Sequence, residues 1–319
     1  MAARTKAITV AHSTACATTV QHGSTLICWI KTVLHRVAPW WALVFVLGAA
    51  AAAGQQHQRP ARIISLIPAI TEMLYALGAG PQVVGVSSFD RYPPEVSKVE
   101  RVGALLDPNL ERILALRPDL VAVYGSQTDL REQLARANIG VFVYTHGGLA
   151  SVSETIRRLG AAVGRSAEAS ALARRLEQRV DEIRRTVAGR PRPKTVVVFG
   201  REAGALRGIY ASGGTGFIHE MVDAAGAENV FADVQREAAQ VTTELILPRR
   251  PDVVLELRAS LTRSEAAKET RVWSALSALP AVKTGRVYVL IDERTVVPGP
   301  RVAEGVELLA RTLHPDVFR

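Results

Sequence analysis

Short apolar runs alternate with longer stretches of helical periodicity along most of the chain. The runs are rich in valine and isoleucine, which favour β-strands. They occupy residues 62–66, 82–86, 119–123 and 140–144 in the first half, and residues 194–199, 229–231, 252–257 and 286–290 in the second. Strands that alternate with helices indicate an α/β fold with parallel sheets. Because the series occurs twice, we predict two lobes of similar construction.

A repeated pattern supports the two lobes. Residues 109–123 and 242–255 each contain a polar N-cap, a glutamate in the first helical turn, a short apolar helix, an Arg-Pro-Asp stop and a buried strand. Similar segments, residues 73–79 and 221–227, precede the two copies. A repeat of this kind specifies architecture and does not by itself specify function.

The segment between the two series is predicted to be helical. Ser151 and Glu154 have the spacing of a capping box that opens one helix, and residues 166–188 form a second helix without glycine or proline. At about 1.5 Å per residue the second helix would span roughly 34 Å, enough to join two lobes rigidly. The predicted parts are an N-terminal lobe over residues 61–150, a helical linker over 151–190 and a C-terminal lobe over 194–319.

Residues 1–54 are predicted to be a leader that directs export. They contain basic residues and no acid, and Val37–Ala53 is apolar apart from small residues. Its alanine-rich end suits signal peptidase cleavage near Gly54, although a retained membrane anchor is the alternative. Both cysteines, Cys16 and Cys28, precede that point, and no lipobox cysteine stands at it. We therefore expect a soluble periplasmic product without disulfides.

The net charge of +9 would suggest a nucleic-acid partner if it were concentrated on one surface. Four of the basic residues belong to the leader, however, and the others alternate with acids along helical faces, as in Arg174–Arg185. Alternating charge is typical of solvated helices. We expect no binding to nucleic acid.

No motif for catalysis or metal binding is found. The chain lacks a G-x-S-x-G nucleophile elbow and a P-loop, and the glycine stretch Ser212–Phe217 misses the dinucleotide fingerprint because His219 stands at its third position. We therefore predict no catalytic residues, no metal site and no cofactor. His146 follows a predicted strand, where α/β proteins commonly bind ligands.

Several aromatic residues also lie in loops that follow predicted strands. Such loops from two facing lobes would converge on a cleft, where aromatic faces can hold a large, partly apolar ligand. The aromatic candidates are Phe89, Tyr92, Tyr124 and Tyr210, with core packing as the alternative for Phe89 and Tyr124. The candidates for polar contacts in second-lobe loops are Arg207, Asp292 and Arg294.

Glu111 and Glu244 occupy equivalent positions in the repeat. One interpretation is that each stabilises the positive end of its helix dipole. The other is that the two carboxylates, one per lobe, bind arginines of a partner with matching two-fold symmetry. The residues alone leave both interpretations open.

Successive motifs resemble one protein family. They are residues 62–72, 85–94, 102–103, 109–111 and 116–121, within a match that extends from Arg62 to Phe318. In this order they are similar to the periplasmic solute-binding proteins for cobalamin, haem and iron-siderophore uptake. The similarity is greatest to the cobalamin-binding member.

The resemblance implies two Rossmann-like lobes with parallel sheets, joined by one long helix, with a ligand cleft between the lobes. It also implies a monomer that delivers its ligand to the transmembrane subunits of an ABC importer. Glu111 and Glu244 match the glutamates with which the family docks on arginines of those subunits.

The resemblance says less about the chemical identity of the ligand. Phe89, Tyr124 and Tyr210 match aromatic contacts of the cobalamin-binding member, whereas Leu105 and Ala238 stand where it has tryptophans. The haem-binding members have a ligating tyrosine at the position of Ala104. We therefore rank a corrinoid first, a ferric siderophore second, and haem, bound through His146, third.

Two functions from other classes are alternatives. One is an exported enzyme or metallochaperone that uses the same cleft, since related folds host cofactor chemistry. The absence of a nucleophile, a metal-binding cluster or a cofactor loop in the sequence argues against it. The other is a ligand sensor for a membrane receptor. The favoured function remains capture of a large metal chelate without catalysis.

Overall fold

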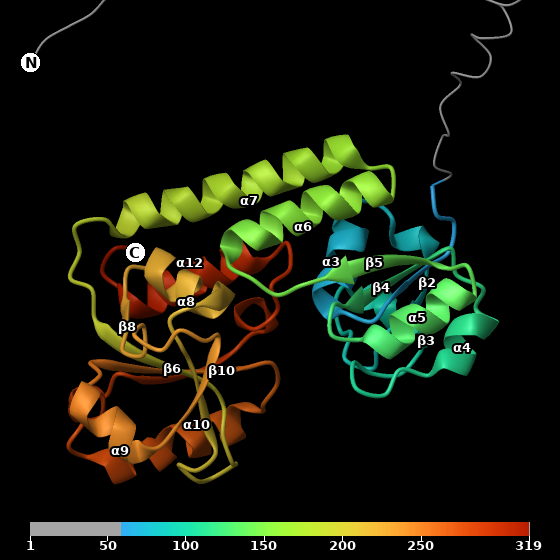
Figure 1. Cartoon of the computed structure of the whole chain (residues 1–319). Coiled ribbons are helices and arrows are strands. Elements are labelled where there is room, and N and C mark those ends of the chain that lie inside the picture. The colour runs from blue at the N-terminus through green and yellow to red at the C-terminus, as the bar shows by residue number, and fades with distance from the viewer. Residues whose placement is uncertain (1–58, 319) are drawn as a thin grey trace, which may run out of the picture. The chain divides into compact units, whose positions relative to one another are not determined.

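The computed structural model describes residues 59–318, and the predicted leader lies outside these described residues. From Arg59 onward the chain forms one compact unit. It contains two α/β lobes joined by the long helix α7, as predicted (Figure 1). No helix of residues 59–318 is both long and apolar enough to cross a bilayer.

The first lobe is built on a parallel five-stranded sheet with the order β3-β2-β1-β4-β5. Its strands are β1 (Ile63–Ser65), β2 (Val83–Val86), β3 (Glu100–Arg101), β4 (Leu120–Tyr124) and β5 (Gly140–Tyr144). Its helices are α3 (Pro68–Ala76), η1 (Gly80–Gln82), η2 (Pro94–Lys98), α4 (Leu110–Ala115) and α5 (Thr128–Arg136). Side chains on both faces of the two strands are buried, namely Ile63 and Ile64 of β1 and Val121 and Ala122 of β4, as expected for a sheet covered on both sides.

The second lobe has a six-stranded sheet with the order β11-β10-β6-β7-β9, and β8 pairs with β6. Its strands are β6 (Lys194–Gly200), β7 (Ile209–Ser212), β8 (Glu228–Asn229), β9 (Ala238–Val241), β10 (Val253–Arg258) and β11 (Val287–Ile291). Its helices are α8 (Gly216–Ala224), α9 (Thr243–Ile246), η3 (Leu247–Arg249), α10 (Arg263–Val272), η4 (Trp273–Leu276), α11 (Pro280–Lys283), η5 (Glu293–Thr295) and α12 (Val302–Leu313).

The second sheet is mixed, so the prediction of parallel sheets in both lobes is corrected. Strand β7 pairs antiparallel with β6 and with β9. The sequence analysis missed β7 and β9 because each has only four residues, with alanine, serine or glutamine at half or more of the positions. Such short, weakly apolar strands are stabilised by the neighbouring strands, and not by their own propensity.

Two helices connect the lobes. α6 (Leu149–Ala162) packs along α7 (Ser166–Val187), which also packs against α8 and α12 of the second lobe. Gly160 of α6 permits this close packing, because a Cβ there would overlap that of Ala169. With 22 residues, α7 is roughly 33 Å long. One buried core runs from the first lobe through both helices into the second, so the lobes share apolar contacts.

The start of α6 differs from the prediction. The helix begins at Leu149, two residues before the predicted capping box at Ser151, and Gly148 at the N-cap has no side chain to cap it. Instead, the carboxylate of Glu220 in α8 accepts a hydrogen bond of 2.6 Å from the Leu149 N–H. The second lobe therefore caps a linker helix, a contact that local sequence cannot reveal.

The aspartates of the repeated Arg-Pro-Asp segments have the same role in both lobes. A carboxylate oxygen of Asp119 accepts a hydrogen bond of 2.8 Å from the backbone of Arg62, next to β1. A carboxylate oxygen of Asp252 accepts one of 3.0 Å from the backbone of Lys194, the first residue of β6. Each aspartate thus fixes the start of the neighbouring strand, which explains why the repeat contains it.

Candidate functional site

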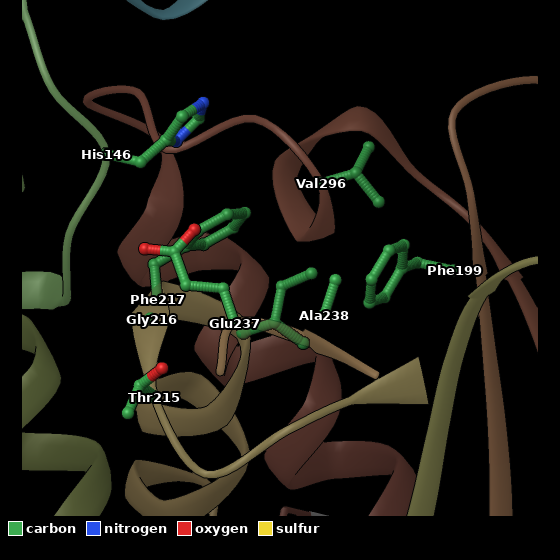
Figure 2. A pocket seen from close by; sticks show the side chains of 9 residues that line it. His146, Phe199, Thr215, Gly216, Phe217, Glu237, Ala238 and Val296 are labelled. Carbon is green, nitrogen blue, oxygen red and sulfur yellow. The ribbon is translucent and has the colours of Figure 1, made fainter. Parts of the chain in front are cut away.

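A cavity of about 280 Å³ opens between the two lobes. His146, in the loop between β5 and α6, lines it from the first lobe, and residues of the second lobe form the remaining wall. Figure 2 shows the apolar part of this wall, with Phe199, Phe217 and Val296 around the space. Glu237 extends its carboxylate towards the side where His146 lies (Figure 2). The cavity is therefore mainly apolar and has a few polar groups at one side.

His146 lies against two tyrosines of the first lobe. The centroid of its ring is 5.5 Å from that of Tyr124 and 5.1 Å from that of Tyr144, and its Nδ1 is 3.4 Å from the Tyr144 hydroxyl. Burial against its neighbours lowers the pKa of His146, and the carboxylate of Glu237 opposes this shift only in part. The imidazole is therefore uncharged at neutral pH, and the first lobe presents a neutral, aromatic surface to the cavity.

Glu237 lies over the first turn of α8. Gly216, the first residue of that helix, has φ +83°, and a Cβ there would come within 2.8 Å of the Glu237 Cγ. Glycine is required at this position, both for its backbone conformation and for the close approach. Within residues 59–318 the carboxylate has no hydrogen-bond partner and no ion pair. It is available to a ligand in the cavity.

A second cavity of about 160 Å³ lies elsewhere between the lobes. Phe89 and Tyr92 line it from the first lobe, and Glu293 and Val297 line it from the second. Phe89 is 63% exposed and Tyr92 is 40% exposed, so neither ring is packed in the core. Their exposure removes the alternative of core packing for Phe89, whereas contact of either ring with a ligand stays a prediction.

A buried ion pair connects the lobes beside this second cavity. The guanidinium of Arg301, just before α12, donates hydrogen bonds of 2.9 and 2.6 Å to the carboxylate of Glu72 in α3. The guanidinium carbon also lies 3.6 Å from the centroid of the Tyr92 ring. Burial raises the pKa of Glu72, and Arg301 opposes this shift. Since bidentate pairs of this kind have fixed geometry, the pair orients the lobes and Tyr92 together.

One glutamine connects Tyr124, the last residue of β4, with Leu105 in the loop after β3. The side chain of Gln127 accepts a hydrogen bond of 2.9 Å from the Tyr124 N–H and donates one of 2.8 Å to the carbonyl of Leu105. Tyr124 is half-buried and stands edge to face with Tyr144. The structure thus places Tyr124 beside His146 and connects Leu105 to the same end of the sheet, which leaves both as predicted ligand contacts.

Tyr210 and Arg207 lie on or before β7, at the carboxyl end of β6. Tyr210 is 45% exposed and pairs with Gly200. Arg207 is exposed, and its Nε lies 3.2 Å from a carboxylate oxygen of Glu202. Both side chains are accessible from the solvent, and their contact with a ligand stays a prediction.

Asp292 and Arg294 form an ion pair with each other. The Nε of Arg294 donates a hydrogen bond of 2.8 Å to Asp292, and its Nη1 donates one of 2.9 Å to Glu304 in α12. The hydrogen bond from Arg294 holds the pKa of Asp292 below its usual range. These contacts fix the loop after β11. They neutralise much of the charge that either residue could offer to a ligand.

Glu111 and Glu244 occupy equivalent exposed positions, each as the second residue of its helix. The pKa of Glu244 lies below its usual range, mainly because the Thr242 hydroxyl is hydrogen bonded to the carboxylate. This carboxylate is therefore ionised. Neither carboxylate has an ion pair within residues 59–318. Helix α9 has only four residues before a 3-10 turn, because Pro248 cannot continue it.

Glu237, Glu72 and Arg301 were not predicted as site residues from the sequence. Glu72 and Arg301 are 229 residues apart, and only the packing of the lobes brings them together. One local signal was present, however. Glu72 is the one charged residue of α3, where residues 69–74 are all buried. An ionised residue on such a face requires a partner.

Two α/β lobes, a long connecting helix and an apolar cavity between the lobes define a solute-binding protein of the class that works outside the cytoplasm. Within the described part of the chain, no three histidine, cysteine or acidic side chains are arranged to hold a metal ion. Residues 63–293 match the family model described as "Periplasmic binding protein", and the chain belongs to that family.

Relatives with known names agree with this membership. The chain is 33% identical over 267 residues to an ABC transporter substrate-binding lipoprotein of Bacillus subtilis, which covers 82% of both chains. It is 31% identical over 223 residues to a vitamin B12-binding protein of Salmonella typhimurium, covering 69% of this chain and 80% of the relative. The crystal structure of the periplasmic vitamin B12 binding protein of Vibrio cholerae matches with a TM-score of 0.68 at 25% identity, covering 82% of this chain and 99% of that one.

The protein is therefore the substrate-binding component of an ABC transporter, in the family that serves vitamin B12, haem and siderophores. Membership implies permease subunits as partners. Because this family binds solutes without transforming them, the prediction of a non-enzymatic protein is confirmed.

Proposed function

We propose that the protein captures cobalamin or another corrinoid and delivers it to the permease of its ABC importer. The observation that carries this proposal is the similarity to vitamin B12-binding proteins over most of the chain. The apolar cavity between the lobes supports it as the place of one part of the ligand, since a corrinoid is a ring system larger than this cavity.

Of the proposed ligand contacts, Phe89 and Tyr92 line the smaller cavity between the lobes. Phe89 and Tyr92 offer exposed aromatic faces from the first lobe, and Tyr210 offers one from the second. The further proposed contacts are Leu105, Tyr124, Arg207, Asp292 and Arg294. Aromatic faces from both lobes would enclose a ring system, while the polar side chains at the rim would orient it.

A ferric siderophore and haem are the alternative ligands. One observation favours haem: His146 presents an uncharged imidazole to the larger cavity, and uncharged imidazole is a common ligand of iron. The lack of a tyrosine at Ala104 disfavours it. Equilibrium dialysis of the purified protein against cyanocobalamin, with haemin and ferrioxamine B in parallel, tests the ranking. We expect retention of cobalamin in preference to both iron chelates.

We also propose that Glu111 and Glu244 are the groups that dock on the permease. Their equivalent positions in the two lobes suit a partner with two-fold symmetry, and their exposed carboxylates suit arginine side chains. Exposed charges of this kind set the orientation and rate of association more than the final affinity.

We propose further that the mature protein is a soluble periplasmic monomer. The Bacillus subtilis relative is named a lipoprotein, whereas no cysteine follows Cys28 in this chain. Mass spectrometry of the protein exported by its own cells should find a first residue near Gln55 and no attached lipid. An intact leader, or an acyl group on Cys28, would contradict this proposal.

A further inference from the structure

We propose that the cavity between His146 and Glu237 is a subsite for an uncharged, hydrogen-bond-donating part of the ligand, such as a carboxamide, and that it rejects a carboxylate at the same place. The inference rests on the proposed function, because it treats this cavity as part of the ligand cleft. It adds a specificity-determining residue, Glu237, and a chemical class of ligand.

The side chains that line the cavity include an acid and no strong base. Of the side chains that line the cavity, Glu237 is the one with a carboxyl group, and neither lysine nor arginine contributes to the wall. The remaining surface is apolar, from Phe199, Phe217, Ile218 and Val296. In such surroundings a carboxylate from the ligand would face a like charge without a compensating cation.

The carboxylate of Glu237 can accept hydrogen bonds that the protein itself does not supply. The oxygens of a carboxylate accept hydrogen bonds, and no side chain or backbone group among residues 59–318 donates one to Glu237. A ligand that removes it from water must therefore supply a donor, or leave a charged acceptor unsatisfied. A primary amide supplies an N–H group without adding negative charge.

The helix behind Glu237 does not reverse this preference. The N-terminus of α8, reached through the glycine stretch Ser212–Phe217, would ordinarily attract an anion. Glu237 lies over its first turn, against Gly216, so the positive end of the helix already faces a carboxylate of the chain itself. A second anion from the ligand gains little there.

His146 does not supply the missing positive charge. It faces the cavity from the first lobe and stands against Tyr124 and Tyr144. Burial lowers its pKa, so it contributes a neutral donor or acceptor near neutral pH. Cobalamin carries carboxamides around its ring, whereas haem carries propionates and ferric catecholates are anionic. Among the ranked ligands, the subsite therefore favours the corrinoid.

The test compares cyanocobalamin with its monocarboxylic acids, in which one propionamide is hydrolysed. Dissociation constants are measured at pH 7.5 for the unmodified protein, Glu237→Gln and Glu237→Arg. Glu228→Gln, a change at an exposed glutamate of β8 outside the cavity, is the matched control. At least one acid isomer should bind at least about tenfold more weakly than the amide to the unmodified protein.

That difference should nearly vanish in Glu237→Gln, reverse in Glu237→Arg and persist in Glu228→Gln. Equal affinity for all acid isomers in the unmodified protein, or a difference that Glu237→Gln leaves intact, would overturn the subsite. Both results require that cobalamin binds, so they leave the proposed function standing.

Failure of the proposed function gives a different result, because no corrinoid would bind at all. The same variants are then compared with cationic ferrioxamine B and an anionic ferric catecholate. If the unmodified protein prefers the cationic chelate and Glu237→Gln loses this preference, the result would support the subsite, although the ligand would not be a corrinoid. A preference for the anionic chelate, or binding of neither, would overturn both proposals.

Discussion

Reversing the charges of Glu111 and Glu244 together is expected to abolish ligand uptake by cells without changing the affinity of the protein for its ligand. Both carboxylates are exposed at the second residue of their helices and have no ion pair among the described residues. If the two glutamates dock on arginines of the permease, as proposed, arginine at both positions would place like charges against each other, and such juxtaposition costs several kcal/mol. Uptake of labelled cobalamin should fall by at least about 100-fold.

Each single reversal should give an intermediate loss, since each glutamate belongs to a different lobe. The matched control is double reversal of Glu154 on α6 and Glu182 on α7, which are exposed but lie on the linker helices. This control should leave uptake close to normal. Normal uptake by the Glu111→Arg/Glu244→Arg protein would show that docking uses another surface.

Replacing Glu256 by alanine is expected to lower the free energy of unfolding by about 3–5 kcal/mol, because it leaves a buried arginine short of its partner. Glu256 lies on β10 and is fully buried. One of its carboxylate oxygens accepts hydrogen bonds from Arg201 at 3.0 and 3.1 Å and from the Trp273 indole at 3.0 Å. The other accepts two from Arg258, of 2.9 and 2.6 Å.

Urea unfolding of the purified protein measures this loss. The control is Glu177→Ala, which removes a half-exposed ion pair with Arg157 and should cost less than about 1 kcal/mol. A loss below about 1 kcal/mol for Glu256→Ala would mean that Arg201 finds sufficient partners elsewhere, such as Glu269.

Patterns within a few consecutive residues predicted the strands and helix starts that depend mainly on those residues. The branched apolar runs gave the central strands, and the polar N-cap at Asn109 does accept a hydrogen bond from the backbone of Arg112. The repeat also placed Glu111 and Glu244 at equivalent positions, because each helix start is specified within a few residues. The parallel first sheet and the long α7 follow from the same periodic patterns.

The remaining features depend on contacts between distant segments. β7 and β9 are too short and too weakly apolar to be recognised before the rest of the sheet is known. Glu237 and His146 lie on different lobes, so their facing positions follow only from the packing of those lobes (Figure 2). Likewise Arg201 and Glu256 resemble surface charges in the sequence, whereas the sheet buries them against each other.

Equilibrium dialysis of the purified protein against cyanocobalamin tests corrinoid capture most directly. Retention of about one cobalamin per chain, with micromolar or tighter affinity as is typical of specific ligand sites, is the expected result. It would mean that Leu105 and Ala238 replace the tryptophans of the cobalamin-binding member without loss of the ligand. Absence of cobalamin binding, with haemin or ferrioxamine B retained in its place, would contradict corrinoid capture and assign the cleft to an iron chelate.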